Sequence, residues 1–232
     1  METRSITTED YLKAIDEFTL YSGYASLSEI AHLLGTARQS AYDEIKILVQ
    51  KGLVERRSRG EYILTREGSV EANIFLRKHR IAEILLWKSL SLPWETIDDE
   101  AMGIEHGITE TIADAVCRKY GCDSCPHGNP VPDETGRVNE IHDIFFSSLK
   151  PDRKYRISRV IFENSEILHY LGARNPNGFM AEVSAPTPIS PPIKVPLAIM
   201  QYASGKLGAV TGKGIGDVLY FLSGFSELKK IS

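Results

Sequence analysis

The sequence predicts a mainly α-helical protein with a smaller β component, and three observations support that fold class. Two short helical segments joined by a turn, and then a basic hairpin, occupy the first seventy residues. Apolar residues at helical spacing continue to about residue 120, whereas from about residue 151 they alternate as in strands. A length of 232 residues allows about two domains, at roughly 100–200 residues each.

The first two helices have recognisable ends. Thr7 or Thr8 can cap a helix that begins near Glu9, with acidic residues in its first turn. Ser28 is expected to cap the second helix, which Gly35 ends.

A third helix and a hairpin complete the N-terminal region. The helix is expected over about residues 39–51, with Ala41, Ile45 and Leu48 facing inward. The segment LVERRSRGEYILT then has the pattern of two short strands around a turn. Helix, turn, helix and basic hairpin together predict a winged helix-turn-helix.

Polar side chains of the third helix and the hairpin are candidates for DNA contacts. The second helix of such a motif enters the major groove, and arginines of the wing contact phosphates. Residues 38–80 contain ten Lys/Arg and six Asp/Glu, a surplus of +4, whereas residues 1–37 contain two and six, a surplus of −4. The candidate DNA-facing residues are Thr36, Ala37, Arg38, Gln39, Ser40, Asp43, Arg56, Arg57 and Arg59.

Two other interpretations of this region remain open. The motif could mediate protein contacts, or its arginines could be an ordinary solvated surface. Asp43 and Glu44 on the third helix also argue for care, because a carboxylate can accept a hydrogen bond from cytosine but repels nearby phosphate.

The segment from residue 77 to residue 106 carries polar side chains where a helix would normally present apolar ones. His79 and Glu83 are four residues apart and share one helical face. A second set follows the spacing i, i+4, i+7, i+8, which also lines one face: Asp98, Met102, Glu105 and His106. Buried charges need partners, and a divalent metal ion would supply one. We therefore interpret the segment as a metal sensor that controls the winged helix.

Each of these residues also has an ordinary structural interpretation. Met102 could belong to the core, and His79 with Glu83 could form a surface pair. Glu105 and His106 could simply end a helix. Together these alternatives require several polar residues to share one face by chance.

A cluster of three cysteines and a histidine lies within eleven residues: Cys117, Cys122, Cys125 and His127. Three thiolates and an imidazole could hold a tetrahedral structural zinc ion. Alternatively, Cys125 and His127 belong to a turn, Cys117 is buried in a helix, and Cys122 has no special role.

The composition excludes several classes of protein. The chain is 42% hydrophobic and 25% charged, as expected for a globular protein, and its net charge of −4 argues against a general polyanion binder. No apolar run approaches the roughly 18 residues of a membrane span. The N-terminus lacks the apolar core of a signal peptide, so we expect a cytoplasmic protein.

The helices around the polar segment carry more apolar residues than one domain needs for its own core. A homodimer would cover the surplus, and its two-fold symmetry would match a palindromic operator in double-stranded DNA. The apolar residues concerned are Ile81, Ile84, Leu85, Trp87, Ile108, Ile112 and Val116.

Four motifs resemble the diphtheria toxin repressor family of metal-dependent transcriptional regulators: TTEDYLKAI, RKHRIAEILL, DDEAMGIEHGIT and CPHGNPVP. The resemblance implies a winged helix-turn-helix domain over residues 1–73 and an all-helical metal-binding and dimerisation domain over residues 74–146. It implies a small SH3-like β-barrel, related to the iron-transport accessory domain, over residues 147–232.

The resemblance also implies two metal sites. The first would consist of Asp10, Met102, Glu105 and His106. Without the family, Asp10 would be interpreted as a residue that complements a helix dipole. The second would consist of His79, Glu83 and Asp98, completed by two acids of the C-terminal region, Glu163 and Glu166. The ordinary alternative for these last two acids is that they cap a helix in solvent.

The ligands of the first site indicate which metal it binds. Asp10 matches the manganese-sensing members of the family, whereas Met102 replaces the Cys of iron sensors and the Glu of manganese sensors. Asp98 replaces the usual His, and Lys13 stands where manganese sensors have an extra acid. Two carboxylates, an imidazole and a thioether suit Fe(II) better than Mn(II). We therefore expect a repressor that senses Fe(II) and controls metal-uptake genes, with Mn(II) as the alternative.

Two rival classes differ in what they leave unexplained. A metallohydrolase, with Glu105 activating a metal-bound water, would give the winged helix no role, so we do not expect an enzyme. A winged-helix regulator that ignores metal would make the polar face purely structural.

Overall fold

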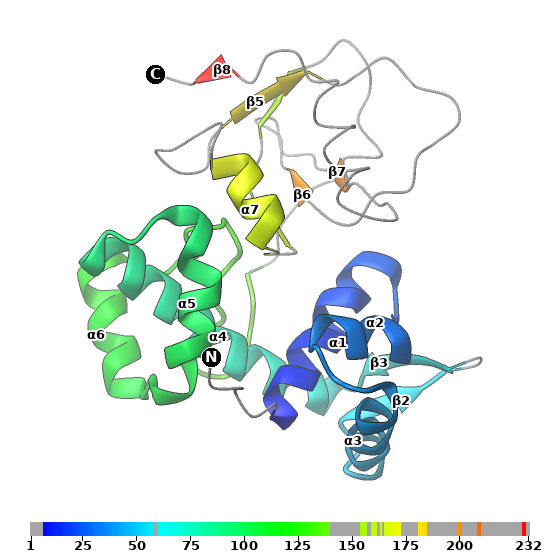
Figure 1. Ribbon diagram of the computed structural model, residues 1–232. Helices are drawn as coiled ribbons and strands as arrows, with labels where there is room; N and C mark the ends of the chain where they lie inside the picture. The colour runs from blue at the N-terminus through cyan, green and yellow to red at the C-terminus, as the bar shows by residue number, and fades with distance from the viewer. Residues whose placement is uncertain are drawn as a thin grey trace. The chain divides into compact units, whose positions relative to one another are not determined.

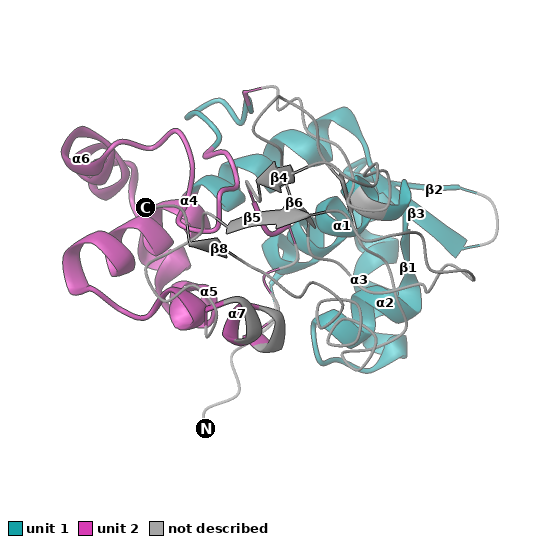
Figure 2. Cartoon of the chain, turned by 90° about the horizontal axis from the view of Figure 1, so that it is seen from above, with its two compact units in different colours: residues 1–77, 132–138 teal, residues 78–131, 139–232 magenta. Residues whose placement is uncertain are grey.

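The computed structural model describes the chain over residues 7–57, 60–139, 154–156, 159–161, 163, 165–172, 181–184, 199–200, 208–209 and 229–230. Figure 1 shows the helices and strands in chain order, and Figure 2 shows the two compact units into which the chain divides. Unit 1 comprises residues 1–77 and 132–138, and unit 2 comprises residues 78–131 and 139–232. Helices predominate and the sheets are small, which confirms the predicted mixture. The C-terminal SH3-like barrel and the three domain boundaries stay predictions.

Unit 1 is a winged helix-turn-helix. Its elements are α1 (Thr8–Ser22), β1 (Ala25–Ser26), α2 (Leu27–Leu33), α3 (Arg38–Gln50), β2 (Val54–Arg56), β3 (Glu61–Leu64) and the first half of α4 (Arg66–Leu90). The three strands form an antiparallel sheet in the order β1-β3-β2. As predicted, Ala41, Ile45 and Leu48 of α3 are buried, and they pack into a core that includes Leu12 and Ile15.

The helix ends of unit 1 show where local sequence signals are sufficient. Thr7 caps α1, and the side chain of Asp10 accepts a hydrogen bond from the backbone N–H of Thr7 at 2.7 Å. The predicted cap of α2 was wrong, because Ser26, not Ser28, is the cap residue. Ser26 has Glu29 three residues later, and the two side chains form a reciprocal capping box.

Unit 2 contains the second half of α4 and a set of shorter elements. These are η2 (Trp94–Thr96), α5 (Ile97–Ile104), η3 (Glu105–Gly107), α6 (Glu110–Tyr120), β4 (Lys154–Arg156), α7 (Ser165–Gly172), β5 (Ala181–Ser184), β6 (Ile199–Met200), β7 (Gly208–Ala209) and β8 (Lys229–Lys230). Strands β4, β5 and β8 form one antiparallel sheet, and β6 pairs with β7. Ile81, Ile97 and Leu168 are fully buried in this unit.

The apolar residues assigned above to a dimer interface mostly belong to this core. Ile81, Ile84, Ile108 and Val116 are buried, whereas 38% of the surface of Ile112 is exposed. Within the described part of the chain, none of the helices has the length and apolar character required to cross a bilayer.

Candidate metal centre and DNA-binding surface

A cluster of acidic and imidazole side chains is buried in unit 2. It draws on α4, α5, η3, the loop after α6 and the segment before α7: His79, Glu83, Asp98, Glu105 and His127, which are buried, and Glu163, which is half-buried. Glu83 and His127 are 0% exposed and Glu105 is 1% exposed. Charged residues are rarely buried so completely unless each has a partner, so the partners of each group decide what the cluster can do.

Both ring nitrogens of His79 face carboxylates. Its Nδ1 lies 2.6 Å from Oε2 of Glu105, and its Nε2 lies 3.0 Å from Oδ1 of Asp98. Oε2 of Glu163 is 3.7 Å from the same Nε2. His79 therefore joins an acid of the first predicted metal site to two acids of the second.

His127 is held by one backbone carbonyl and one carboxylate. Its Nε2 lies 2.9 Å from the carbonyl oxygen of Trp94, and its Nδ1 lies 2.5 Å from Oε1 of Glu83. Since a carbonyl only accepts hydrogen bonds, Nε2 carries the proton that it donates. A histidine that binds a metal usually donates its other N–H in this way, so Nδ1 is the nitrogen available to an ion.

Asn129 positions Glu163. The side chain of Asn129 is buried, and its Nδ2 donates to the carbonyl oxygen of Val160 at 2.6 Å and also to Oε1 of Glu163. The backbone N–H of Val160 donates in turn to the carbonyl of His127 at 2.9 Å. The segment that carries Glu163 is thereby fastened to the loop that carries His127.

The charges of the cluster do not balance. Its four carboxylates (Glu83, Asp98, Glu105 and Glu163) outnumber its two buried imidazoles, and the imidazole of His106, 3.8 Å from Glu105, does not make up the difference. Within the described part of the chain, Oε2 of Glu83 is buried and has no hydrogen-bond partner. A buried carboxylate oxygen without a partner is costly, and a divalent cation would remove both defects. The residues therefore fit a metal ion.

Two overlapping sets of side chains place their ligand atoms within 4.8 Å of one another. One set is Glu83, Cys125, His127 and Glu163, and the other is His79, Glu83, Asp98 and Glu163. The second set contains four of the five residues predicted for the second metal site. Glu166 lies on α7, and its side chain is outside the described part of the structure. Cys125 and His127 lie more than forty positions from Glu83 in the sequence, so no local spacing indicates that they meet it.

Burial and the charges within the first set shift the pKa values of its members. Burial, followed by the charges of Glu83 and Glu163, raises the pKa of Cys125 to about 12. Burial alone would lower the pKa of His127, but the same two carboxylates raise it well above its usual value. Burial alone would raise the pKa of Glu163, yet His127 and His79 hold it well below the usual value. Each group thus depends on the charge of its neighbours.

The predicted structural zinc site was wrong. Cys117 and Cys122 are joined by a disulfide, with their Cα atoms 5.0 Å apart, so neither offers a free thiolate. Cys125 is a buried free thiol, and it lies with His127 in the acidic cluster. The short spacing in sequence suggested four ligands for one ion. In the structure α6 ends at Tyr120, and the loop that follows places Cys125 beside Glu83 and Glu163.

The predicted polar face of residues 98–106 divides into two halves. Asp98 and Glu105 are buried in the cluster, whereas Met102 is 36% exposed and the side chain of His106 is 37% exposed. The prediction assumed one continuous α-helix, but α5 ends at Ile104 and a tighter 3-10 turn carries Glu105 and His106. The turn changes the helical period for Glu105 and His106, whereas Asp98 and Met102 both lie within α5.

The first predicted metal site stays a prediction. Met102, Glu105 and His106 belong to unit 2, and Nε2 of His106 lies 3.8 Å from Oε1 of Glu105. Asp10 belongs to unit 1, where it is buried and completes the capping box of α1. The site would need one ligand from the first unit and three from the second.

The candidate DNA-facing residues lie on one exposed side of α3 and on the hairpin of unit 1. Ala37, Arg38, Gln39, Ser40 and Asp43 are exposed, as are Arg56 and Arg57, and Thr36 is half-buried. Arg59 lies outside the described residues. The two acids that argued against DNA binding both have hydrogen bonds within unit 1. Oε1 of Glu44 accepts from the hydroxyl of Thr8 at 2.8 Å, and Oδ1 of Asp43 accepts from Nε2 of Gln39 at 3.1 Å.

A winged helix with an exposed polar helix, and a buried cluster suited to a divalent ion, define the class of metal-responsive transcription regulators. The family model described as "Iron dependent repressor, metal binding and dimerisation domain" matches residues 65–133. The chain is 43% identical to the T. acidophilum IdeR whose crystal structure is known, with a TM-score of 0.76, and the match covers 90% of this chain and 94% of that one. The chain belongs to the diphtheria toxin repressor family of metal-dependent transcriptional repressors.

Other relatives are more distant. The iron-dependent repressor IdeR of Mycobacterium leprae (strain TN) is 29% identical over 127 residues, which are 54% of this chain and 55% of that protein. This chain therefore matches about half the length of that curated relative. The structure titled "Manganese-dependent transcriptional repressor complex with manganese" shares the fold at 22% identity, with a TM-score of 0.71 and coverage of 88% of this chain and 94% of that one.

Proposed function

We propose that the protein is a metal-dependent transcriptional repressor, in which unit 1 binds operator DNA and unit 2 holds a divalent metal ion. The observation that carries this proposal is the buried cluster of unit 2, in which carboxylates outnumber imidazoles and Oε2 of Glu83 has no hydrogen-bond partner among the described residues. A purely structural cluster would be selected for balanced charge, because an uncompensated buried carboxylate is strongly destabilising.

Side chains of unit 2 would hold the ion in the second site. Oε2 of Glu83 and Nδ1 of His127 are the primary candidates, and Glu163 and either Cys125 or the pair His79 and Asp98 would complete the set. The Trp94 carbonyl and the Asn129 amide keep His127 and Glu163 in place. Glu166 is proposed as a further ligand from α7, on the ground of the family resemblance.

Control of DNA binding would come from the first site. When bound, a divalent cation supplies positive charge to carboxylates that otherwise repel one another. Asp10 of unit 1 would share it with Met102, Glu105 and His106 of unit 2, so the two units would become fixed to each other. In a homodimer this would set the distance between two reading helices, which must match half-sites about 34 Å apart or a multiple of it. A coupling of about 1–3 kcal/mol changes affinity roughly 5–150-fold.

Fe(II) is the proposed metal, with Mn(II) as the alternative. The thioether of Met102 and the imidazole of His106 are softer ligands than an all-carboxylate site would offer. The relatives named as iron-dependent repressors, and the 43% identity to the T. acidophilum IdeR, support the same choice. We propose accordingly that a cytoplasmic homodimer represses genes of metal uptake at palindromic operators, and that the chain is not an enzyme.

The test is selection of duplex DNA by the full chain from a pool with a randomised central region. The selected duplexes are then titrated with protein in Fe(II) under anaerobic conditions, in Mn(II) and in chelator. We expect binding in either metal, half-maximal at a lower concentration of Fe(II), and at least about fivefold weaker binding in chelator. Equal binding in all three conditions would reject metal control, and no selected duplex would reject DNA binding.

A histidine variant tests the ligands of the first site. His106→Ala should abolish the metal-dependent gain in DNA affinity, because it removes the imidazole ligand, while leaving the fold intact since the side chain is partly exposed. His169→Ala is the matched control, because His169 is an exposed histidine of the same unit. Metal activation of His106→Ala equal to that of the control would refute the assignment.

A further inference from the structure

The exposed start of α3 carries a pair of side chains, Gln39 and Asp43, that are joined by a hydrogen bond. Gln39 is the second residue of α3, and Asp43 follows one turn later on the same face. Nε2 of Gln39 donates to Oδ1 of Asp43 at 3.1 Å. This inference rests on the proposed function, namely that unit 1 binds duplex DNA.

The bond to Asp43 leaves Gln39 with a defined set of free groups. A glutamine amide has two N–H donors and an oxygen that accepts two hydrogen bonds. One N–H is used by Asp43, so one donor and the whole acceptor remain. Adenine presents the complementary pair in the major groove, an acceptor at N7 and a donor at N6, and a bidentate glutamine is the usual reader of that pair.

We propose that Gln39 reads an adenine of the operator in the major groove, and that Asp43 is a positioning residue that holds its amide for that contact. The first residues of the reading helix are those that contact base edges in a helix-turn-helix, and Gln39 is exposed at this place. Fixing a long side chain before binding lowers the entropy that binding would cost.

The charges around Gln39 agree with this role. On α3 the carboxylate of Asp43 already accepts a hydrogen bond from the side-chain amide of Gln39. The next acid, Glu44, accepts from the hydroxyl of Thr8 on α1 and is half-buried. Arg38 and Arg56 line the same cleft as Gln39, and their guanidinium groups attract phosphate.

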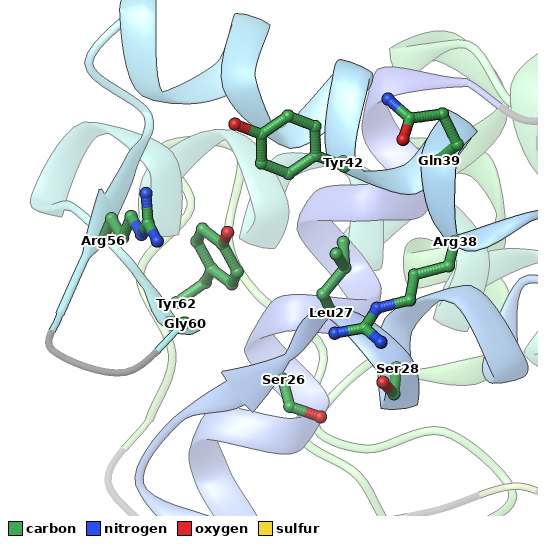
Figure 3. Close-up of a pocket in the computed structure, with 9 residues that line it drawn as sticks. All are labelled: Ser26, Leu27, Ser28, Arg38, Gln39, Tyr42, Arg56, Gly60 and Tyr62. Carbon is green, nitrogen blue, oxygen red and sulfur yellow. The ribbon is translucent and has the colours of Figure 1, made fainter.

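A cleft next to Gln39 can receive the DNA backbone. It has a volume of about 610 Å³, and Arg38, Gln39 and Tyr42 of α3 line it together with Ser28 of α2 and Arg56 of the wing (Figure 3). In Figure 3 the guanidinium of Arg38 extends toward Leu27 and Ser28, and Arg56 stands on the other side of the cleft. A phosphate contacted by both arginines would fix the register of the duplex, whereas the base contact would supply sequence preference.

The experiment measures base preference by selection from a randomised duplex pool with the Mn(II)-loaded full chain. We expect one position in each half-site at which wild type prefers adenine, and at which other bases weaken binding roughly 5–150-fold, the range of a good bidentate contact. Gln39→Ala should bind all four bases at that position equally well and keep its preference elsewhere. Gln50→Ala, an exposed glutamine at the other end of α3, is the matched control and should behave as wild type.

Two further variants separate reading from positioning and from charge. Asp43→Ala should reduce the preference at that one position, and Asp43→Asn should restore it, because the asparagine oxygen can still accept from Gln39. Arg56→Ala should weaken binding to all duplexes alike. It should also reduce the slope of log binding constant against log salt concentration by about one, as expected for the loss of one phosphate contact.

The outcomes distinguish this inference from the proposed function. If the wild-type protein selects duplexes but Gln39→Ala keeps the same base preference, or weakens all duplexes alike, the assignment to adenine is overturned while DNA binding stands. If wild type selects no duplex, both are overturned.

Discussion

The two units use polar side chains in opposite environments. In unit 2 the acids and histidines are buried, their charges do not balance, and one carboxylate oxygen has no partner among the described residues. In unit 1 most polar residues of α3 are exposed, and its two acids, Asp43 and Glu44, accept hydrogen bonds from neutral donors. A buried surplus of charge calls for an ion inside the fold, whereas an exposed polar helix face can be satisfied by water until a larger partner replaces it.

The largest expected effect is on the stability of unit 2. Adding Mn(II) at about 100 times its dissociation constant should raise the free energy of unfolding by about 2.7 kcal/mol, because the ion binds only the folded cluster. Differential scanning calorimetry in metal and in chelator measures the shift. Glu83→Gln should lose most of the shift, since it removes the unpartnered oxygen, whereas Glu134→Gln, at an exposed acid of unit 1, should keep it. An equal shift in both variants would mean that the ion binds elsewhere.

The next effect concerns the residue that positions Glu163. Asn129→Ala removes two hydrogen bonds made by a buried amide, and loss of such a supporting contact typically lowers metal affinity about 10–100-fold. Isothermal titration calorimetry of metal-free protein with Mn(II) measures the metal affinity. Asn139→Ala, at an exposed position of the same unit, is the control. Unchanged affinity in Asn129→Ala would show that Glu163 is not a ligand.

The smallest expected effect lies in unit 1. Thr8→Val removes the hydroxyl that holds Glu44, which should cost about 0.5–1.5 kcal/mol of stability. It should also weaken DNA binding slightly at low salt, because the released carboxylate repels phosphate. Thermal unfolding and a salt series of DNA titrations check both. Equal stability of Thr8→Val and wild type would show that the bond contributes nothing in solution.

The same contrast explains how much could be predicted from the sequence. The winged helix follows from local signals, namely capping residues, apolar spacing and a turn between two short strands, and only the cap at Ser26 was misplaced. His79 and Glu83 lie in one cluster, as their spacing on a single helix predicts. The meeting of Glu83 with His127 depends on how a loop folds back on α4, and no spacing in the sequence encodes it.

The error over the cysteine cluster has a physical origin. Cys117, Cys122, Cys125 and His127 are neighbours in sequence, yet the disulfide and the turn after α6 separate them into two environments. The end of that helix, not its interior, decides where these side chains lie.

The central claim is that the buried acidic cluster of unit 2 holds a divalent cation. Crystals of the full chain soaked in Mn(II) and measured at a wavelength where manganese scatters anomalously would test it directly. The account predicts an anomalous peak at coordination distance from Oε2 of Glu83 and Nδ1 of His127. No anomalous peak in the cluster, for a protein whose DNA binding in solution depends on Mn(II), would contradict this claim.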